Sequence, residues 1–156
     1  MFEIYRYTDS DQSIWDDFVP NANNGTLFHL RSFLSYHPHD RFVDHSLLVN
    51  KKGKIFSVFP AAEQEINGNR YLVSHPGSSV GSFVVNENLS IADSINLVKS
   101  LISYSKRLKF DGIRITLPPN LYQRRLSNYM DFSFLKNNFN YLKREITSIL
   151  YLEKSL

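Results

Sequence analysis

Apolar side chains recur at helical spacing in four parts of the chain. This spacing predicts a helix that Ser10 or Asp11 caps and that Pro20 and the following Asn/Gly run end. Further helices are predicted at residues 30–36, 90–108 and 127–137. Ser90, with Asp93 at the reciprocal position, is predicted to cap the longest of them.

Extended segments lie between these helices, where apolar residues alternate or form short runs. The predicted strands are residues 2–6, 45–49, 55–62, 71–74, 82–85, 112–117 and 141–152. Hairpin turns are predicted at Lys51-Lys52-Gly53-Lys54 and at Asn67-Gly68-Asn69. The order predicts an α/β (α+β) protein with a mixed, mostly antiparallel sheet flanked by helices on both faces. We expect residues 1–156 to form a single domain.

Composition narrows the class of protein. The 156 residues contain no cysteine, so disulfides, thiolate nucleophiles and cysteine zinc sites are excluded. The first residues are not a signal peptide and no apolar run has the length of a membrane span, so we expect a cytoplasmic location. The net charge of +3 is uneven: residues 1–104 hold 8 Lys and Arg against 11 Asp and Glu, and the remainder holds 10 against 4. The basic part suggests a phosphate-bearing ligand or a solvated face.

The most informative motif is SHPGSSVGS, at residues 74–82, which follows a predicted strand. Histidine can exchange a proton near neutral pH, and hydroxyls and loop amides can bind an oxyanion or a phosphate. We therefore take His75 as the candidate catalytic base. The candidate substrate-binding residues of this loop are Ser74, Gly77, Ser78 and Ser79. The alternative is a surface turn that a structural histidine closes.

A second polar motif is YHPHDR at residues 36–41, with Asp44 and His45 nearby. Tyr36, His37 and Arg41 are candidate substrate contacts. The histidines and carboxylates are ligand types for a divalent metal, but Pro38 interrupts any regular spacing, so we expect no metal site. Arg41 is alternatively expected to pair with Asp44.

Six blocks, in this order, resemble the opening of FemAB-like proteins of the GNAT superfamily. They are WDDFV (15–19), NGTLFH (24–29), FLSYH (33–37), DRFVDHSL (40–47), FPAA (59–62) and SHPGSS (74–79). The resemblance implies a GNAT-like fold and acyl or aminoacyl transfer to an amine, with an acyl-CoA or an aminoacyl-tRNA as possible donor. FemAB-like proteins hold two such domains in tandem, so this chain resembles the N-terminal, acceptor-side half.

The chain departs from the family pattern at two places. Val80-Gly81-Ser82 stands where the resemblance implies Tyr-Gly-Gly. GNAT enzymes commonly have a glycine-rich turn before the long helix, which holds the coenzyme pyrophosphate. Here residues 86–90 read NENLS, with no glycine and with Glu87, whose charge repels phosphate.

The leading expectation is an acceptor-side acyltransferase domain for an amino sugar or a cell-envelope peptide precursor. A second GNAT-like domain or another copy of the chain would complete it. The first alternative is a self-sufficient N-acetyltransferase that uses acetyl-CoA. The second is a non-catalytic binding module, for example for RNA through Arg124 and Arg125, and a tRNA partner also stays open.

Overall fold

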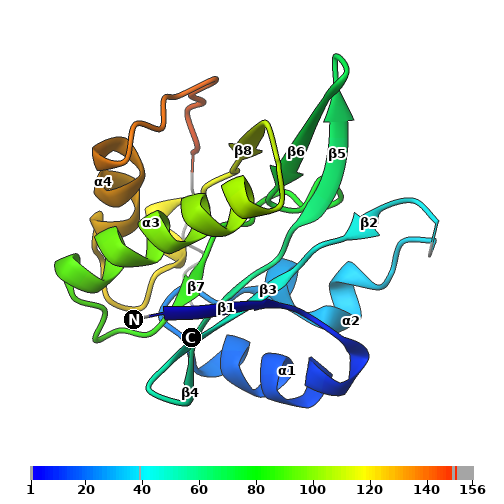
Figure 1. Ribbon diagram of the computed structural model, residues 1–156. Helices are drawn as coiled ribbons and strands as arrows, with labels where there is room; N and C mark the ends of the chain where they lie inside the picture. The colour runs from blue at the N-terminus through cyan, green and yellow to red at the C-terminus, as the bar shows by residue number, and fades with distance from the viewer. Residues whose placement is uncertain (1, 39, 149, 151–156) are drawn as a thin grey trace.

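The computed structural model describes residues 2–38, 40–148 and 150. Its strands form two four-stranded sheets with helices on either side (Figure 1). The first sheet has the order β1 (Phe2–Arg6), β3 (Leu47–Lys51), β4 (Lys54–Phe59) and β7 (Val84–Val85). The second has the order β2 (Val43–Asp44), β5 (Ala62–Ile66), β6 (Asn69–Val73) and β8 (Gly112–Arg114). The helices are α1 (Gln12–Asn21), α2 (Arg31–Leu34), α3 (Ile91–Arg107) and α4 (Tyr129–Lys136).

The strands are antiparallel except for the β6–β8 pair, which is parallel. This confirms the predicted mixed, mostly antiparallel architecture. The prediction of one strand over residues 55–62 is wrong, because β4 ends at Phe59 and β5 begins at Ala62. Pro60 lies between them, and its missing N–H and fixed φ favour a break in the ladder. The chain therefore passes here from the first sheet to the second.

Alternating side chains of the first sheet build two apolar cores. Leu47 and Val49 of β3 pack in the larger core with α3 and α4, whereas Leu48 packs in the smaller core with α1. Helices α1 and α2 thus cover one face, and α3 and α4 the other (Figure 1). Since successive strand side chains point to opposite faces, one strand serves both cores.

Both predicted hairpin turns are confirmed. Lys52 and Gly53 connect β3 to β4 with φ of 53° and 73°. Asn67 and Gly68 connect β5 to β6 with φ of 53° and 76°. Two consecutive left-handed residues form the turn that matches the twist of a hairpin, and Asn and Gly adopt this conformation readily.

The four predicted helices form, but two cap side chains and the end of α1 differ from the prediction. Ser90 caps α3 by accepting the Asp93 N–H at 3.1 Å, but the Asp93 carboxylate bonds Lys51 Nζ at 2.6 Å. The Asp11 carboxylate accepts from Thr8 instead of capping α1. Helix α1 continues through Pro20 to Asn21. Within the described residues, no helix combines the length and the apolar character that a membrane crossing requires.

The prediction of a strand at residues 141–152 is wrong for its described part. Residues 141–148 and 150 join neither sheet, and residues 149, 151 and 152 lie outside the described residues. In Figure 1 the orange segment leaves α4 as irregular chain. The strand predicted at 112–117 is assigned only as β8, and the chain beyond it reaches the short helix η3 (Asn120–Tyr122).

Candidate functional site

The loop of residues 74–82, here called the His75 loop, connects β6 to β7. Ser74 Oγ accepts the Thr116 N–H at 2.9 Å, and the Ser74 N–H donates to the Arg114 carbonyl at 2.8 Å. Ser78 Oγ donates to the Val80 carbonyl at 2.7 Å. These hydroxyls hold the loop in shape, and a substrate contact by Ser74 or Ser78 stays a prediction. Ser79 is exposed.

His29 fixes the far end of the His75 loop from beneath. Its Nε2 lies 3.1 Å from the Gly81 carbonyl, and its Nδ1 lies 3.2 Å from the Thr26 N–H. Nε2–H therefore donates and Nδ1 accepts, which is the neutral tautomer. Burial lowers the pKa of the His29 imidazole, and the bonds to Gly81 and Thr26 offset this only in part. In the sequence, His29 was notable only as the last residue of the NGTLFH block.

His37 fixes the middle of the same loop. Its Nε2–H donates to the Gly77 carbonyl at 3.0 Å, and its Nδ1 accepts from Arg41 Nη1 at 3.0 Å. The contact requires glycine: a Cβ on residue 77 would lie 2.3 Å from His37 Nε2 and 2.7 Å from the Phe42 ring. Residues 36 and 37 of one motif and 77 of the other, which the sequence singled out separately, thus belong to one site.

The His75 side chain is buried, with 3% of its surface exposed. Its Nδ1 is buried and has no hydrogen-bond partner. The ring packs edge-on against Phe42, with centroids 5.3 Å apart. Burial lowers the pKa of the His75 imidazole to about 4, Asp44 raises it in part, and Arg31 and His37 lower it further. The ring is therefore neutral near pH 7, with one polar atom that lacks a partner.

A polar network lies beside His75. Arg31 pairs with the Asp44 carboxylate, and Arg31 Nη1 donates to Ser46 Oγ at 3.0 Å. Burial raises the pKa of the Asp44 carboxyl, but Arg31 and Ser46 outweigh it and hold the pKa below its usual value. The expected pair of Arg41 with Asp44 is wrong, because Arg41 lies against His37 and Arg31 takes the carboxylate.

We call the resulting arrangement the histidine site: Tyr36, His37, Arg41, Gly77 and His75. Tyr36 is 84% exposed and packs edge-on near the His37 ring, with centroids 6.1 Å apart. Arg41 is also exposed. Tyr36 and Arg41 both contact His37, and His37 bonds the loop that carries the buried His75 imidazole. Of the predicted residues, Ser74 and Ser78 belong to the loop scaffold, and Ser79 lies on the loop with no contact to this site that the structure describes.

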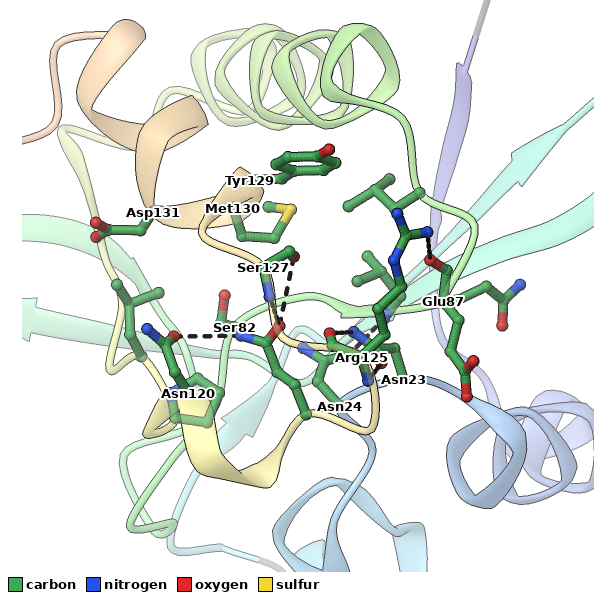
Figure 2. Close-up of a pocket in the computed structure, with 16 residues that line it drawn as sticks. Asn23, Asn24, Ser82, Glu87, Asn120, Arg125, Ser127, Tyr129, Met130 and Asp131 are labelled. Atoms are coloured by element: carbon green, nitrogen blue, oxygen red, sulfur yellow. Dashed lines mark hydrogen bonds between the residues drawn. The ribbon is translucent and has the colours of Figure 1, made fainter.

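A second polar site, a small pocket, lies where the His75 loop ends and α3 begins (Figure 2). Ser82, Glu87, Arg125 and Asp131 are among its lining residues. Its volume is about 50 Å³, room for a few water molecules. No single motif of the sequence points to this pocket, because its walls come from three separate segments of the chain.

Two asparagines hold the walls of the pocket together. Asn23 Nδ2 donates to the Arg125 carbonyl at 3.0 Å, and Asn23 Oδ1 accepts the Arg125 N–H at 2.7 Å. Asn24 makes the equivalent pair with the Phe83 carbonyl at 2.8 Å and the Val85 N–H at 2.8 Å. Both side chains are buried, and each bonds a neighbouring backbone as a strand would.

Arg124 and Arg125, the candidate RNA contacts, both donate hydrogen bonds to backbone carbonyls in this region. Arg125 Nη1 donates to the Glu87 carbonyl at 3.0 Å, as the dashed line in Figure 2 shows. Arg124 Nη2 donates to the Pro20 carbonyl. Their guanidinium groups close loops against backbone oxygens, so they offer the RNA-binding alternative little support.

His45 belongs to a separate buried group. In the sequence it lies near the YHPHDR motif, but its hydrogen-bond partners are far from that motif. Its Nδ1–H donates to Glu63 at 2.8 Å, and its Nε2 accepts from the Tyr104 hydroxyl at 2.9 Å. Burial lowers the pKa of the His45 imidazole, and Glu63 offsets this in part. His37 and His45 thus have different partners, and among the described residues no three His, Asp or Glu side chains gather as metal ligands.

Solved structures of acetyltransferases are similar to this chain over nearly its whole length. A GNAT family acetyltransferase from Staphylococcus aureus is 13% identical, with a TM-score of 0.55, over 96% of this chain and 98% of that one. A ribosomal-protein-alanine N-acetyltransferase from Brucella melitensis is 11% identical, with a TM-score of 0.57, over 96% and 99%. An aminoglycoside acetyltransferase from an uncultured soil sample, in complex with sisomicin, is 10% identical, with a TM-score of 0.53, over 98% and 97%.

The fold is that of the GNAT acetyltransferases. The likeness shows the fold and does not single out the FemAB-like group. No protein-family model matches the sequence, and no curated protein matches it either.

The GNAT fold implies an acyl-CoA, whose pyrophosphate the resemblance would place at the start of α3. The residues there do not fit that group. The preceding turn lacks glycine, Glu87 is acidic, and Ser90 Oγ is already bonded to the Asp93 N–H. The adjoining pocket of about 50 Å³ is far smaller than the roughly 300–1,000 Å³ of ordinary ligand sites.

Proposed function

We propose that this chain is the acceptor-binding domain of a GNAT-type acyl- or aminoacyltransferase, as in the N-terminal half of FemAB-like proteins. The acceptor is an amine on an amino sugar or a cell-envelope peptide precursor. The observation that carries the proposal is the histidine site, where the buried His75 Nδ1 has no partner among the described residues and the exposed Tyr36 and Arg41 contact His37 nearby. Buried polar atoms in folded proteins are normally bonded to protein, water or ligand, and a polar group of the acceptor is the partner that the proposal assigns to this one.

The low pKa defines what His75 does in this proposal. A base with a pKa of about 4 is a weak proton acceptor at neutral pH, so His75 acts by hydrogen bonding rather than as the general base. Because Nδ1 is buried against Phe42 in the structure, a polar group of the acceptor reaches it only when the His75 loop or Phe42 shifts. His37 and Arg41 fix the loop that carries it, and Tyr36 supplies an aromatic face for a sugar or peptide. The deprotonation of the amine and the binding of the donor are assigned to another domain or chain.

Two further observations agree with an acceptor-only domain. The start of α3 does not fit a coenzyme pyrophosphate, and the pocket beside it is small. One solved structure of the same fold is described as an aminoglycoside acetyltransferase in complex with sisomicin, so an amino sugar is a reasonable acceptor class for a domain of this fold.

The alternative is a self-sufficient acetyltransferase. It is supported by the comparisons, in which this chain aligns with 97–99% of three acetyltransferase chains. In that case the purified chain transfers acetyl groups from acetyl-CoA without any other protein.

Calorimetric titration of the full chain with UDP-amino sugars, peptidoglycan peptides and acetyl-CoA distinguishes the two. Under the proposal an amine acceptor binds, and Tyr36→Ala weakens its binding about tenfold, that is by ~1.4 kcal/mol. Tyr122→Ala, an exposed tyrosine elsewhere, is the control and leaves binding unchanged. Acetyl-CoA binding with turnover, and no binding of the amines alone, would overturn the proposal.

A further inference from the structure

The second sheet ends in an open edge at β8. β8 pairs with β6 on one side, and the sheet order places no described strand on its other side. The Arg114 carbonyl accepts the Ser74 N–H, and the Thr116 N–H donates to Ser74 Oγ, so these residues bond toward β6 and the His75 loop. Since alternate residues of a strand bond in opposite directions, Ile113 and Ile115 direct their peptide groups to the open side.

The peptide groups of these two residues are available to pair with another strand. Among the described residues, the peptide groups of Ile113 and Ile115 have no backbone partner on the open side. Their side chains pack against the α3 core. A strand added here would gain backbone hydrogen bonds and would continue an apolar face. Open edges of this kind favour pairing with another chain.

The same chain carries a segment with the matching properties. Residues 141–148 and 150, here called the C-terminal segment, form no strand in the structure. Leu142, Ile146 and Leu150 are 78%, 98% and 84% exposed. All three have even numbers, so in an extended conformation they share one face. Arg144 and Ser148 share this face. Among the described residues of this segment, the peptide groups join no sheet, so the segment can still pair as a strand.

We propose that the C-terminal segment of one copy adds as a strand to the β8 edge of a second copy. Two such contacts, related by a two-fold axis, give a closed dimer in which each copy donates one strand and accepts one. The proposal commits to a second copy because one chain holds both complementary parts, and within residues 2–38, 40–148 and 150 they are not paired with each other. It does not depend on the acyl-transfer proposal.

The first test is the mass of the full chain in solution over a range of concentrations, by sedimentation. We expect a dimer that Ile146→Lys weakens about a hundredfold, since each symmetric contact loses one buried apolar side chain. Thr147→Lys adds the same charge at an exposed residue of the opposite face and should leave the dimer intact. Both residues are exposed in the single copy, so neither change should lower its melting temperature.

Hydrogen exchange then locates the contact. The amides of Ile113 and Ile115 should be protected at dimer-forming concentrations and exchange faster in Ile146→Lys. Three results would overturn the proposal: a monomer at every concentration, a dimer that survives Ile146→Lys, or a dimer in which these amides exchange freely. A monomer with both amides protected would mean that the segment pairs within its own chain, and this too overturns the dimer.

Discussion

His37 donates from Nε2 to the carbonyl of Gly77 at 3.0 Å, across 40 residues of sequence. The bond joins the two polar motifs and fixes the tautomer of His37, because Nδ1 must then accept from Arg41. It also holds the His75 loop at Gly77, two residues from His75. The shape of the histidine site therefore depends on this contact.

Gly77→Ala should break the hydrogen bond between His37 Nε2 and the carbonyl of residue 77. The added Cβ would lie 2.3 Å from His37 Nε2, so the imidazole must move and the bond must lengthen. We expect a loss of about 1–3 kcal/mol in the free energy of unfolding, the usual range for overpacking. Urea unfolding measures it, with Ser79→Ala, an exposed change in the same loop, as the control. Equal stability of the two variants would contradict the geometry.

Ser82→Gly should stabilise the protein. Ser82 is buried and has a φ of 78°, a left-handed conformation that costs a residue with a Cβ about 1–2 kcal/mol. The greater freedom of glycine in the unfolded chain offsets part of the gain, so we expect a net increase of about 0.5–1 kcal/mol in the free energy of unfolding. The resemblance implies glycine at this position.

Asn67→Gly is the matched control for Ser82→Gly. Asn67 also has a positive φ, of 53°, but asparagine tolerates this conformation well. Thermal unfolding should therefore show no gain for Asn67→Gly. A destabilised Ser82→Gly variant would show that the serine side chain contributes more than its backbone conformation costs.

Asn23→Ala should loosen the small pocket beside α3. The change removes both bonds to the Arg125 backbone and leaves those groups without partners. We expect a loss of about 2 kcal/mol in the free energy of unfolding. Asn21→Ala removes one exposed bond to the Asp17 carbonyl and should cost less than about 0.5 kcal/mol. Similar losses in the two variants would mean that the Asn23 pair contributes little.

Acid should destabilise the protein before its carboxylates titrate. The folded His75 has a pKa of about 4, whereas in the unfolded chain it takes up a proton near its ordinary value of about 6.5. The unfolded state therefore binds more protons between these values, and the free energy of unfolding falls as the pH falls through this window. The full contribution is on the order of 3 kcal/mol. His29 and His45, whose pKa values are also lowered, act in the same direction.

His75→Phe measures how much of this pH dependence of the free energy of unfolding comes from His75. Phenylalanine fills the space without an unsatisfied polar atom, so the variant should be as stable as the wild type at about pH 7. Between about pH 7 and about pH 5 it should lose less stability than the wild type in urea unfolding. An unchanged pH dependence would mean that the folded His75 titrates as a free imidazole.

The sequence predicted local structure well where a single segment determines it. The Asn67-Gly68 turn and the Ser90 cap depend on side chains within three residues of one another, and both are confirmed. The passage of the chain between sheets at Pro60 and the unpaired C-terminal segment depend on distant strands, which the period-two pattern alone does not reveal.

The same distinction applies to the candidate site. Tyr36, His37, Arg41, Gly77 and His75 were predicted from residue type. The structure connects the first four through His37, and their role in binding substrate stays a prediction. The sequence could not show that Ser74 and Ser78 also bond the backbone of Thr116 and Val80, because residue type alone does not reveal the partner of a hydroxyl. Asn23, Asn24 and His29 were not identified as site-forming, since their partners lie 52 to 102 residues away.

Ring resonances of His75 in the full chain, followed by NMR during titration, test the central claim most directly. The account predicts that an amino-sugar or envelope-peptide amine shifts the His75 nitrogen signals and that acetyl-CoA alone does not. The shift should disappear in Tyr36→Ala and persist in Tyr122→Ala. Binding of acetyl-CoA near α3 with no response of His75 to any amine would contradict the account.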